Sequence, residues 1–512
     1  MMPQSFTVYD ILARNASIRG ERTALVTENG RRCDFRAMLE RVDRLAAGLA
    51  EAGLSRGDRL VVLAQNSSVY FELYFAAARL GIVLYPLNWR WTAEEVAGSL
   101  GRAKARGIMI ERQYHDVLPA DLGEDCRLRW EFDPGAQGPA EGWGSVEDLY
   151  RPGAPVPAGR VRASDPFAII STAAVDVIPR GAVLTHSNVL FSNLQSIEAM
   201  GLDENDGNAL FLPLFHVAAL SGSLAVMHAG GQNVIMTGFD AERAVRLIDE
   251  HGLTFMGDFP PILMTVLDKA KELGTALPSL KHVNGLDAPD TIARLHEETG
   301  ADFWTGFGQT ETSGFVTLQR ARAKPGAAGK AGAVCQLKLV DDYDNEVPMG
   351  TPGEILVRGP VVFDGYFDQP EVNEHTFRNG WHHTGDVGRF DENGTLYYVK
   401  RKPEKELIKP GGENVYPAEV ERVVMEMDGV RAVCVFGVGD SRWGEAVAAV
   451  VEADEGVHVG DEVREFVAGR IARFKRPAHV GFMETLPRDD AGGVDRDAVK
   501  SLWAPRFQGK DR

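Results

Sequence analysis

The alternation of short apolar runs with amphipathic helical runs is the feature that most constrains the fold of this chain. Residues 59–63 have the pattern of a buried strand, residues 70–77 that of an amphipathic helix between Ser68 and Gly81, and residues 82–87 that of a second strand. Ser is favoured at the start of a helix and Gly at its end. Strand–helix–strand alternation is typical of a parallel sheet covered by helices. We therefore expect an α/β fold.

Length and charge set further limits. A chain of 512 residues is too long for one small core and suggests several lobes. The net charge of −18 argues against a nucleic-acid-binding surface, which would need a basic face. The segment 133–165 is rich in Pro and Gly and is interpreted as a surface excursion.

Cysteine spacing and apolar run lengths bear on the compartment. The four cysteines are scattered, without a C-x-x-C pair or a metal-ligand spacing, which favours reduced thiols in a cytoplasm. Residues 1–14 contain no apolar signal core. No apolar run reaches the ~20 residues that a membrane span needs. We expect a cytoplasmic protein without a membrane span.

The stretch 304–314, W-T-G-F-G-Q-T-E-T-S-G, carries the strongest chemical signal. Gly306 and Gly308 flank Phe307, which lets the backbone pass close to a flat ligand and leaves a ring to stack on it. Thr310 can donate to a phosphate oxygen, and the Glu311 carboxylate can hold a Mg²⁺ that also contacts phosphate. A polar loop between a strand and a helix is the alternative interpretation of this stretch alone.

This stretch closely resembles the G-[YF]-G-x-T-E segment of the adenylate-forming acyl-CoA synthetase superfamily. Further segments resemble the family's other motifs in the same order along the chain. At the site of the family's phosphate loop, T-S-G-T-T-G-x-P-K-G, this chain keeps Thr172, Pro179 and Gly181 and has Arg180 in place of Lys. Arg is a good phosphate partner because it is always charged and can bind with two N–H groups.

The same loop also departs from the family. Residues 173–177 are Ala, Ala, Val, Asp and Val, so the internal glycines and most hydroxyls are lost. Gly reaches positive φ freely, whereas other residues pay ~1–2 kcal/mol there. A purely structural loop that no longer binds triphosphate is the alternative.

Two segments resemble the part of the family's site that borders the acyl group. Residues 210–218 match P-L-[FY]-H-x-x-[GA], which places His216 and Val217 at the acyl pocket. Residues 281–289 align with the G-G-A-P stretch beside adenine and the acyl group, although Leu286 and Asp287 are atypical there. A packed core histidine and a tight turn are the alternatives.

The C-terminal motifs imply a ribose site and a mobile lobe. Residues 380–388 match G-W-x-x-T-G-D, in which Asp386 would accept hydrogen bonds from the ribose hydroxyls. Arg401 matches the family's arginine that contacts ribose and phosphate. Gly411 and Gly412 fall in the loop that, in relatives, swings in after adenylation and lines the pantetheine tunnel.

One family residue is missing near the C-terminus. The family pattern P-[RK]-x-x-x-G-K-[IV]-x-R has a lysine that bridges the acyl carboxylate and the α-phosphate, and Gly493 stands there in this chain. Losing one such donor typically costs ~10²–10³ in rate. The candidates to supply the missing charge are Arg488, Arg496, Lys500 and Lys409.

The resemblance spans residues 8–500. It implies a large N-terminal domain of mixed sheets flanked by helices (1–400), an approach to a hinge (401–404), and a small mobile α+β domain (405–512). It also implies that a carboxylate and ATP form an acyl-adenylate and pyrophosphate, after which CoA displaces AMP. ATP, Mg²⁺, CoA and a small carboxylic acid are the expected ligands, and a homodimer is left open.

The resemblance assigns the site residues as follows. Those expected in catalysis are Thr310, Glu311, Arg180 and Lys409, with Glu311 also holding the metal. Those expected at the nucleotide or CoA are Thr172, Gly285, Leu286, Asp287, Phe307, Gly308, Gln309, Thr310, Asp386, Arg401, Gly411 and Gly412. Those expected around the acyl group are His216, Val217, Gly285 and Gly306.

Two other functions remain open from the sequence. The first is an adenylating ligase that transfers the acyl group to an amine or a carrier-protein thiol. The second is a catalytically impaired homologue that binds acyl-nucleotides or acyl-CoA, since both the degenerate phosphate loop and Gly493 belong to the ATP half-reaction.

Overall fold

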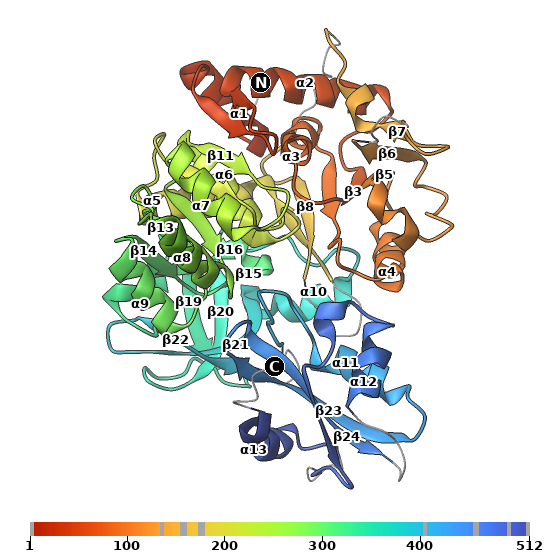
Figure 1. Cartoon of the computed structure of the whole chain (residues 1–512), viewed down its shortest axis with the longest axis vertical. Helices are drawn as coiled ribbons and strands as arrows, with labels where there is room; N and C mark the ends of the chain where they lie inside the picture. The colour runs from red at the N-terminus through yellow and green to blue at the C-terminus, as the bar shows by residue number, and fades with distance from the viewer. Residues whose placement is uncertain are drawn as a thin grey trace.

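The computed structural model describes residues 5–133, 138–153, 161–172, 180–402, 407–453, 460–488 and 493–507. A large body carries the N-terminal four-fifths of the chain, and a smaller lobe at one end carries the C-terminal strands (Figure 1). This is the α/β fold with a large and a small domain that the sequence predicts. The expected hinge residues 403 and 404, and the swivel after them, lie outside the described residues.

A seven-stranded sheet forms one side of the large body, in the order β7-β6-β5-β3-β4-β8-β9. The predicted strand–helix–strand unit is confirmed as β3 (Arg59–Leu63), α3 (Ser68–Leu80) and β4 (Val83–Pro86), and the two strands are parallel. The helix cap differs by one residue, because the side chain of Ser67, not Ser68, accepts from the Tyr70 amide. Gly81 ends the helix at a φ of 73°, as its position predicts.

The far edge of this sheet corrects one expectation. The other strands are β5 (Gly107–Glu111), β6 (Leu128–Phe132), β7 (Gly144–Ser145), β8 (Pro166–Ser171) and β9 (Gly181–Thr185). The segment 133–165 is not wholly a surface excursion, because β7 pairs with β6 and the short helix η3 (Val146–Leu149) buries both of its end residues. Val146 and Leu149 are too few to form a repeating apolar pattern, so the sequence alone does not predict a buried element in this segment.

A nine-stranded sheet forms the second side, in the order β18-β17-β14-β13-β12-β10-β11-β1-β2. Its strands are β1 (Thr23–Val26), β2 (Arg32–Asp34), β10 (Gly207–Leu210), β11 (Gln232–Ile235), β12 (Phe255–Asp258), β13 (His282–Gly285), β14 (Asp302–Thr305), β17 (Thr317–Arg320) and β18 (Lys330–Ala331). The central strands from β11 to β14 are parallel, so their carboxyl ends share one edge. Ligands of open α/β sheets bind at that edge.

Helices cover the two sheets and fill the space between them. They are α1 (Val8–Arg19), α2 (Phe35–Glu51), α4 (Ala93–Ala103), α5 (His186–Met200), α6 (Val217–Ala229), α7 (Ala241–His251), α8 (Ile262–Leu273), α9 (Pro289–Glu298) and α10 (Pro370–Thr376). One continuous apolar cluster includes residues of α1, α2, α3, α5 and α6 together with strands of both sheets. The two sheets therefore share a core.

Two antiparallel sheets complete the large body. The four-stranded sheet contains β19 (Gln336–Val340), β20 (Gly353–Arg358), β21 (His382–Phe390) and β22 (Leu396–Arg401), and its last strand leads to the small lobe. The two-stranded ribbon of β15 (Gly308–Gln309) and β16 (Gly314–Phe315) encloses the short helix η4 (Thr310–Thr312). This ribbon presents the predicted Thr310–Glu311 pair.

The small lobe is an α+β unit. It contains α11 (Pro417–Met425), β23 (Val430–Asp440), β24 (Gly444–Ala453), α12 (Asp461–Ala468), β25 (His479–Met483) and α13 (Arg496–Phe507). β23 and β24 are the longest strands of the lobe, and α12 ends at Ala468, just before Gly469. Each face of this sheet packs an apolar cluster of its own.

Two expectations from composition can be compared with the structure. None of the four cysteines, all of which lie within the described residues, forms a disulfide, and three of them are buried. Over the described part of the chain, no helix combines the length and the apolar character that a membrane crossing requires.

The contact between α2 and η3 gives a stability prediction. A Cβ added to Gly48 would overlap the backbone carbonyl of Leu149, whereas one added to Gly98 in α4 would meet no atom within 4 Å. We expect Gly48→Ala to destabilise the protein by about 1–3 kcal/mol through overpacking. Gly98→Ala, the matched control, should be neutral or stabilising by about 0.5–1 kcal/mol. Thermal unfolding of both variants tests this, and equal melting temperatures would contradict it.

Candidate active site

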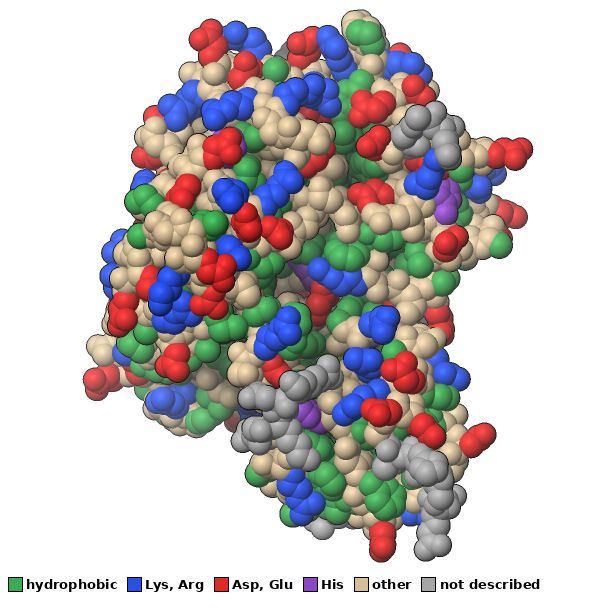
Figure 2. Space-filling view, viewed as in Figure 1, with side chains coloured by type: hydrophobic (Ala, Val, Ile, Leu, Met, Phe, Trp, Pro, Cys, Tyr) green, Lys and Arg blue, Asp and Glu red, His purple; other side chains and the backbone are tan. Residues whose placement is uncertain are grey.

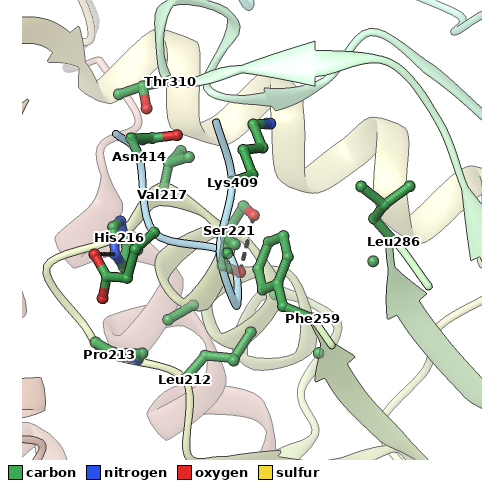
Figure 3. Close-up of a pocket in the computed structure, with 18 of the residues that line it drawn as sticks. Leu212, Pro213, His216, Val217, Ser221, Phe259, Leu286, Thr310, Lys409 and Asn414 are labelled. Carbon is green, nitrogen blue, oxygen red and sulfur yellow. Dashed lines mark hydrogen bonds and ion pairs between the residues drawn. The ribbon is translucent and has the colours of Figure 1, made fainter. Parts of the chain in front are cut away.

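A cavity of about 350 Å³ lies where the carboxyl edge of the nine-stranded sheet meets the small lobe. Figure 2 shows a hollow in the surface at the junction of the two lobes, with charged side chains around it. In the close-up, Lys409 and Asn414 of the small lobe face His216 and Val217 at the start of α6 (Figure 3). Both lobes therefore contribute walls to one site.

Most of the predicted site residues meet in this cavity. Those that line it are Thr172, Arg180, His216, Val217, Gly285, Leu286, Gly306, Gly308, Gln309, Thr310, Glu311, Arg401, Lys409, Gly411 and Gly412. They come from segments that are more than 200 residues apart in the sequence. Three predicted residues, Asp287, Phe307 and Asp386, are not among the lining residues.

Glu311 is held by a tyrosine that the sequence motifs do not include. The Tyr366 hydroxyl donates to Glu311 Oε1 over 2.7 Å. Burial, reinforced by the neighbouring Glu311 carboxylate, raises the pKa of Tyr366 well above its ordinary value, so its hydroxyl stays a donor. The Arg180 guanidinium lies 5.4 Å from the centre of the same ring. Tyr366 thus sits between an acid and a cation, both of which line the cavity.

The ends of the predicted phosphate loop lie side by side. The loop joins β8 to β9, which are antiparallel neighbours, and the Thr172 amide donates to the Arg180 carbonyl over 2.7 Å. Residues 173–179 between them lie outside the described residues. The structure therefore places Thr172 and Arg180 in the cavity and leaves the effect of the lost glycines a prediction.

Asp386 lies directly behind the cavity wall. Its side chain is only 1% exposed, accepts from the Tyr398 hydroxyl over 3.2 Å and lies 3.3 Å from Arg401 Nε. The Gln309 amide also donates to it. Because Arg401 and Gln309 line the cavity, Asp386 acts on the cavity through them in this arrangement.

Phe307 differs from its expected place. Phe307 is 6% exposed and belongs to an apolar cluster with Val316 and with Ile355 and Val357 of β20. Its ring stacks on Tyr398, with ring centres 6.5 Å apart. The ring that the sequence assigns to a flat ligand therefore packs in an apolar cluster and is not among the residues that line the cavity.

Asp287, which the sequence assigns to the nucleotide or CoA, is also not among the residues that line the cavity. Burial raises the pKa of Asp287, and it raises the pKa of the fully buried Asp258 well above its ordinary value, with Asp287 adding to that rise. One oxygen of Asp258 accepts from the Leu263 amide at the start of α8. The second oxygen of each carboxyl is buried, and the raised pKa of both groups favours a protonated carboxyl that can donate to its neighbour. The two side chains therefore join the end of β12 to the loop that follows Gly285 at the end of β13.

A glutamate of the small lobe closes the cavity against the large body. Glu413 accepts from Asn88 over 3.0 Å and from Arg90 over 2.8 Å, and His216 Nε2 lies 3.7 Å from it. Although burial opposes ionisation, His216, Arg90 and Asn88 keep the pKa of Glu413 below its ordinary value. A buried carboxylate paired with large-body groups holds the loop that begins at Gly411.

Lys409 is the one candidate for the missing charge that reaches the cavity in this arrangement. Burial, together with the neighbouring Arg401, lowers the pKa of Lys409 to about 8, although nearby carboxylates oppose the change. Arg488 pairs with Glu452 and Arg496 with Glu421, both within the small lobe. Neither they, Lys500 nor Gly493 are among the lining residues.

Sequence reasoning missed several residues at the junction. They are Asn88, Arg90, Tyr366, Glu413 and Tyr416. Glu413 stands inside a matched loop, so the motif itself could have raised it. Asn88, Arg90 and Tyr366 carry no local signal, since their roles depend on contacts with residues far along the chain.

Comparison with known proteins agrees with this geometry. The family model for AMP-binding enzymes matches residues 12–367, and the model for the AMP-binding enzyme C-terminal domain matches residues 419–492. The chain is 33% identical to the indoleacetate–CoA ligase of Aromatoleum aromaticum, over 90% of this chain and 92% of that protein. It is 31% identical to a feruloyl-CoA synthase of an Amycolatopsis species, over 95% and 97% of the two chains.

A solved structure shows the same architecture. The o-succinylbenzoate CoA synthetase of Bacillus subtilis, bound as a double mutant to a product analogue, superposes with a TM-score of 0.83 at 25% identity and covers 97% of this chain and 98% of that one. The family matches cover both the large body and the small lobe that enclose the cavity. The chain is a member of the family of AMP-binding enzymes, the adenylate-forming acyl-CoA synthetase superfamily.

Proposed function

We propose that the cavity between the two lobes is where this AMP-forming acid–thiol ligase converts a small carboxylic acid into its CoA thioester. The observation that carries the proposal is the convergence of Thr310, Glu311, Arg180, Arg401 and Lys409 on one cavity. A hydroxyl, a carboxylate and three cations are the groups that bind phosphates and a divalent metal.

The nucleotide would lie along the cavity wall formed by the ribbon of β15 and β16 and by the end of β22, the strand that leads to the small lobe. Its phosphates would contact Thr310 and Arg180, and its ribose would reach Arg401, which Asp386 holds in place. The backbone at Gly285, Gly306 and Gly308 would border the base, because glycines leave no side chain between ligand and backbone.

Glu311 suits Mg²⁺ as a partner. Only one of its two carboxylate oxygens is engaged by Tyr366, and its side chain lines the cavity. Mg²⁺ is commonly held by one or two carboxylates together with substrate phosphates. When bound, the metal would offset phosphate charge, and the chain's own contribution would be to hold Glu311 in a fixed position through Tyr366.

The acid would occupy the apolar end beside α6. Leu212, Val217, Phe255 and Phe259 line this part, and a Cβ on Gly222 would lie only 3.1 Å from the Phe255 ring. This close packing of helix and ring would narrow the pocket there and would favour a compact acid over a long chain. Two relatives are named for compact aryl acids, indoleacetate and ferulate, which supports this class of substrate.

The residues then have distinct tasks in the two steps. In the first, a carboxylate oxygen attacks the α-phosphate and pyrophosphate leaves, and Arg180 and Lys409 would offset the repulsion between the two anions. In the second, the CoA sulfur attacks the acyl carbonyl, the thiol proton is lost, and AMP leaves with the bridging oxygen. The thiol arm would pass Gly411 and Gly412, where the backbone is free of side chains.

A direct assay tests the function. The protein is incubated with ATP, Mg²⁺ and a panel of aryl and alkyl acids, with and without CoA, and pyrophosphate and AMP are followed. We expect pyrophosphate without CoA and AMP plus an acyl-CoA with it. An amine or carrier-protein acceptor that outperforms CoA would favour the alternative ligase. No pyrophosphate with any acid would favour the impaired homologue.

The lowered pKa of Lys409 gives a prediction of pH dependence. A lysine that titrates near 8 is charged below that pH and neutral above it, so the rate of adenylation should fall as pH rises through about 8. Lys409→Met should lower that rate by about 10²–10³ at pH 7. Lys409→Arg should keep the charge and remove the fall near pH 8. Exposed Lys330→Met is the control, and an unchanged profile in Lys409→Arg would contradict this role.

Glu311 gives a prediction of metal dependence. Glu311→Gln keeps the shape of the side chain but removes its charge, so half-maximal pyrophosphate release should need at least about tenfold more Mg²⁺. Tyr366→Phe should produce a smaller shift in the same direction because only the orientation of the carboxylate is lost. Glu374→Gln, an exposed change in α10, should leave the Mg²⁺ titration unaltered. Identical titrations of Glu311→Gln and the control would exclude Glu311 as the metal ligand.

A further inference from the structure

A lysine of the small lobe is buried between two carboxylates, one from each lobe. Lys475, in the short helix η8 (Arg473–Lys475), is 3% exposed. Its Nζ donates to Glu419 Oε1 over 2.6 Å and also to Glu95 Oε1. Glu419 belongs to α11 of the same lobe, whereas Glu95 belongs to α4 of the large body.

Glu95 is held in place by its own helix. Its second carboxylate oxygen accepts from the amide and the hydroxyl of Thr92, which caps the N-terminus of α4. One oxygen therefore completes the helix cap while the other receives the lysine. The Glu95 side chain is only 7% exposed, so the ion pair forms in a largely water-free contact.

Apolar residues next to Lys475 seal the same contact. Ala472 is 1% exposed and belongs to an apolar cluster of the large body around strands β3, β4 and β5. Phe474 packs against that cluster and also against the core of the small lobe. Excluding water strengthens a charge pair and raises the penalty for leaving one member unpaired.

The contact is specific to one orientation of the small lobe. In this orientation the loop from Gly411 to Asn414 lines the cavity, and no described residue after Tyr416 does. Moving this loop out of the cavity would require the lobe to turn about the hinge, and Lys475 would then leave Glu95. Lys409 follows the hinge by only a few residues, so it would move less than Lys475 and could act at the cavity in both orientations. Glu419 would travel with Lys475, so the lysine would keep one partner while the lobe moves.

We propose that Glu95 and Lys475 form a latch that holds the small lobe in the orientation that transfers the acyl group to CoA. Both are positioning residues, since neither lines the cavity. The inference rests on the proposed function, because it assigns the observed orientation to the second of the two steps. Because Glu419 moves with Lys475, the lysine stays paired when it leaves Glu95, so the latch can open and close again without an unpaired buried lysine.

The test separates the two half-reactions in Glu95→Gln. Glutamine can still accept from Thr92, so the helix cap survives while the charge that attracts Lys475 is lost. Glu94→Gln, an exposed neighbour on the same helix, is the matched control. Pyrophosphate release in the first turnover without CoA should change by less than about twofold in both variants. Acyl transfer to CoA from preformed acyl-adenylate should slow by at least about tenfold in Glu95→Gln alone.

The outcomes distinguish this inference from the proposed function. A wild-type protein that makes no acyl-adenylate would refute the proposed function, whereas an active wild type with Glu95→Gln equal to Glu94→Gln would refute the latch. Equal slowing of both half-reactions would show a merely structural role and would also refute it.

A second measurement does not depend on activity. Spin labels on the exposed positions 93 in α4 and 462 in α12, in a background without native cysteines, report the distance between the lobes. We expect one narrow distance distribution in the otherwise unchanged protein and in Glu94→Gln. Glu95→Gln should give a broader distribution with longer distances. The same distance distribution in the otherwise unchanged protein, Glu94→Gln and Glu95→Gln would refute the latch, whatever the stability of Glu95→Gln.

Discussion

The pairing of buried charges across the junction of the two lobes is the interaction on which the rest of the site depends. The Glu413 side chain, 13% exposed, pairs with Asn88, Arg90 and His216, and Lys475 is buried against Glu95. A buried charge is tolerated only when its partner is present. In the observed orientation of the small lobe each of these charges has its partner, and the same orientation completes the cavity.

The sheets explain why the cavity lies where it does. The carboxyl ends of β10, β12, β13 and β14 share one edge, and residues just beyond these ends line the cavity. The ribbon that follows β14 adds Thr310 and Glu311, and the last strand of the four-stranded sheet ends at Arg401. Elements of three sheets thus converge on one point, which the small lobe then covers.

The features that were predictable from the sequence are those with local causes. The strand at 59–63 follows from a β-branched apolar run, and the turn at Gly81 from its need for a positive φ. Most motif residues line the cavity as predicted, because each motif specifies the local backbone conformation of its own short segment. Lys409 was proposed as one of several cations, and only the arrangement of the lobes distinguishes it from Arg488 and Arg496.

The features that escaped prediction depend on distant contacts. Phe307 packs in an apolar cluster with residues of the four-stranded sheet, and Asp287, in the loop after β13, raises the pKa of Asp258 at the end of β12. Glu95 and Lys475 are 380 residues apart in the sequence. No local pattern of residue types encodes such pairs.

The most direct test of the account is a crystal structure of the protein with a non-hydrolysable acyl-adenylate analogue and Mg²⁺. We predict density for the phosphate mimic beside Thr310 and Arg180, for the metal at Glu311 and for the ribose at Arg401. The acyl group should lie beside α6, against Val217 and Phe259. An analogue bound outside the cavity, or a metal bound away from Glu311, would contradict it.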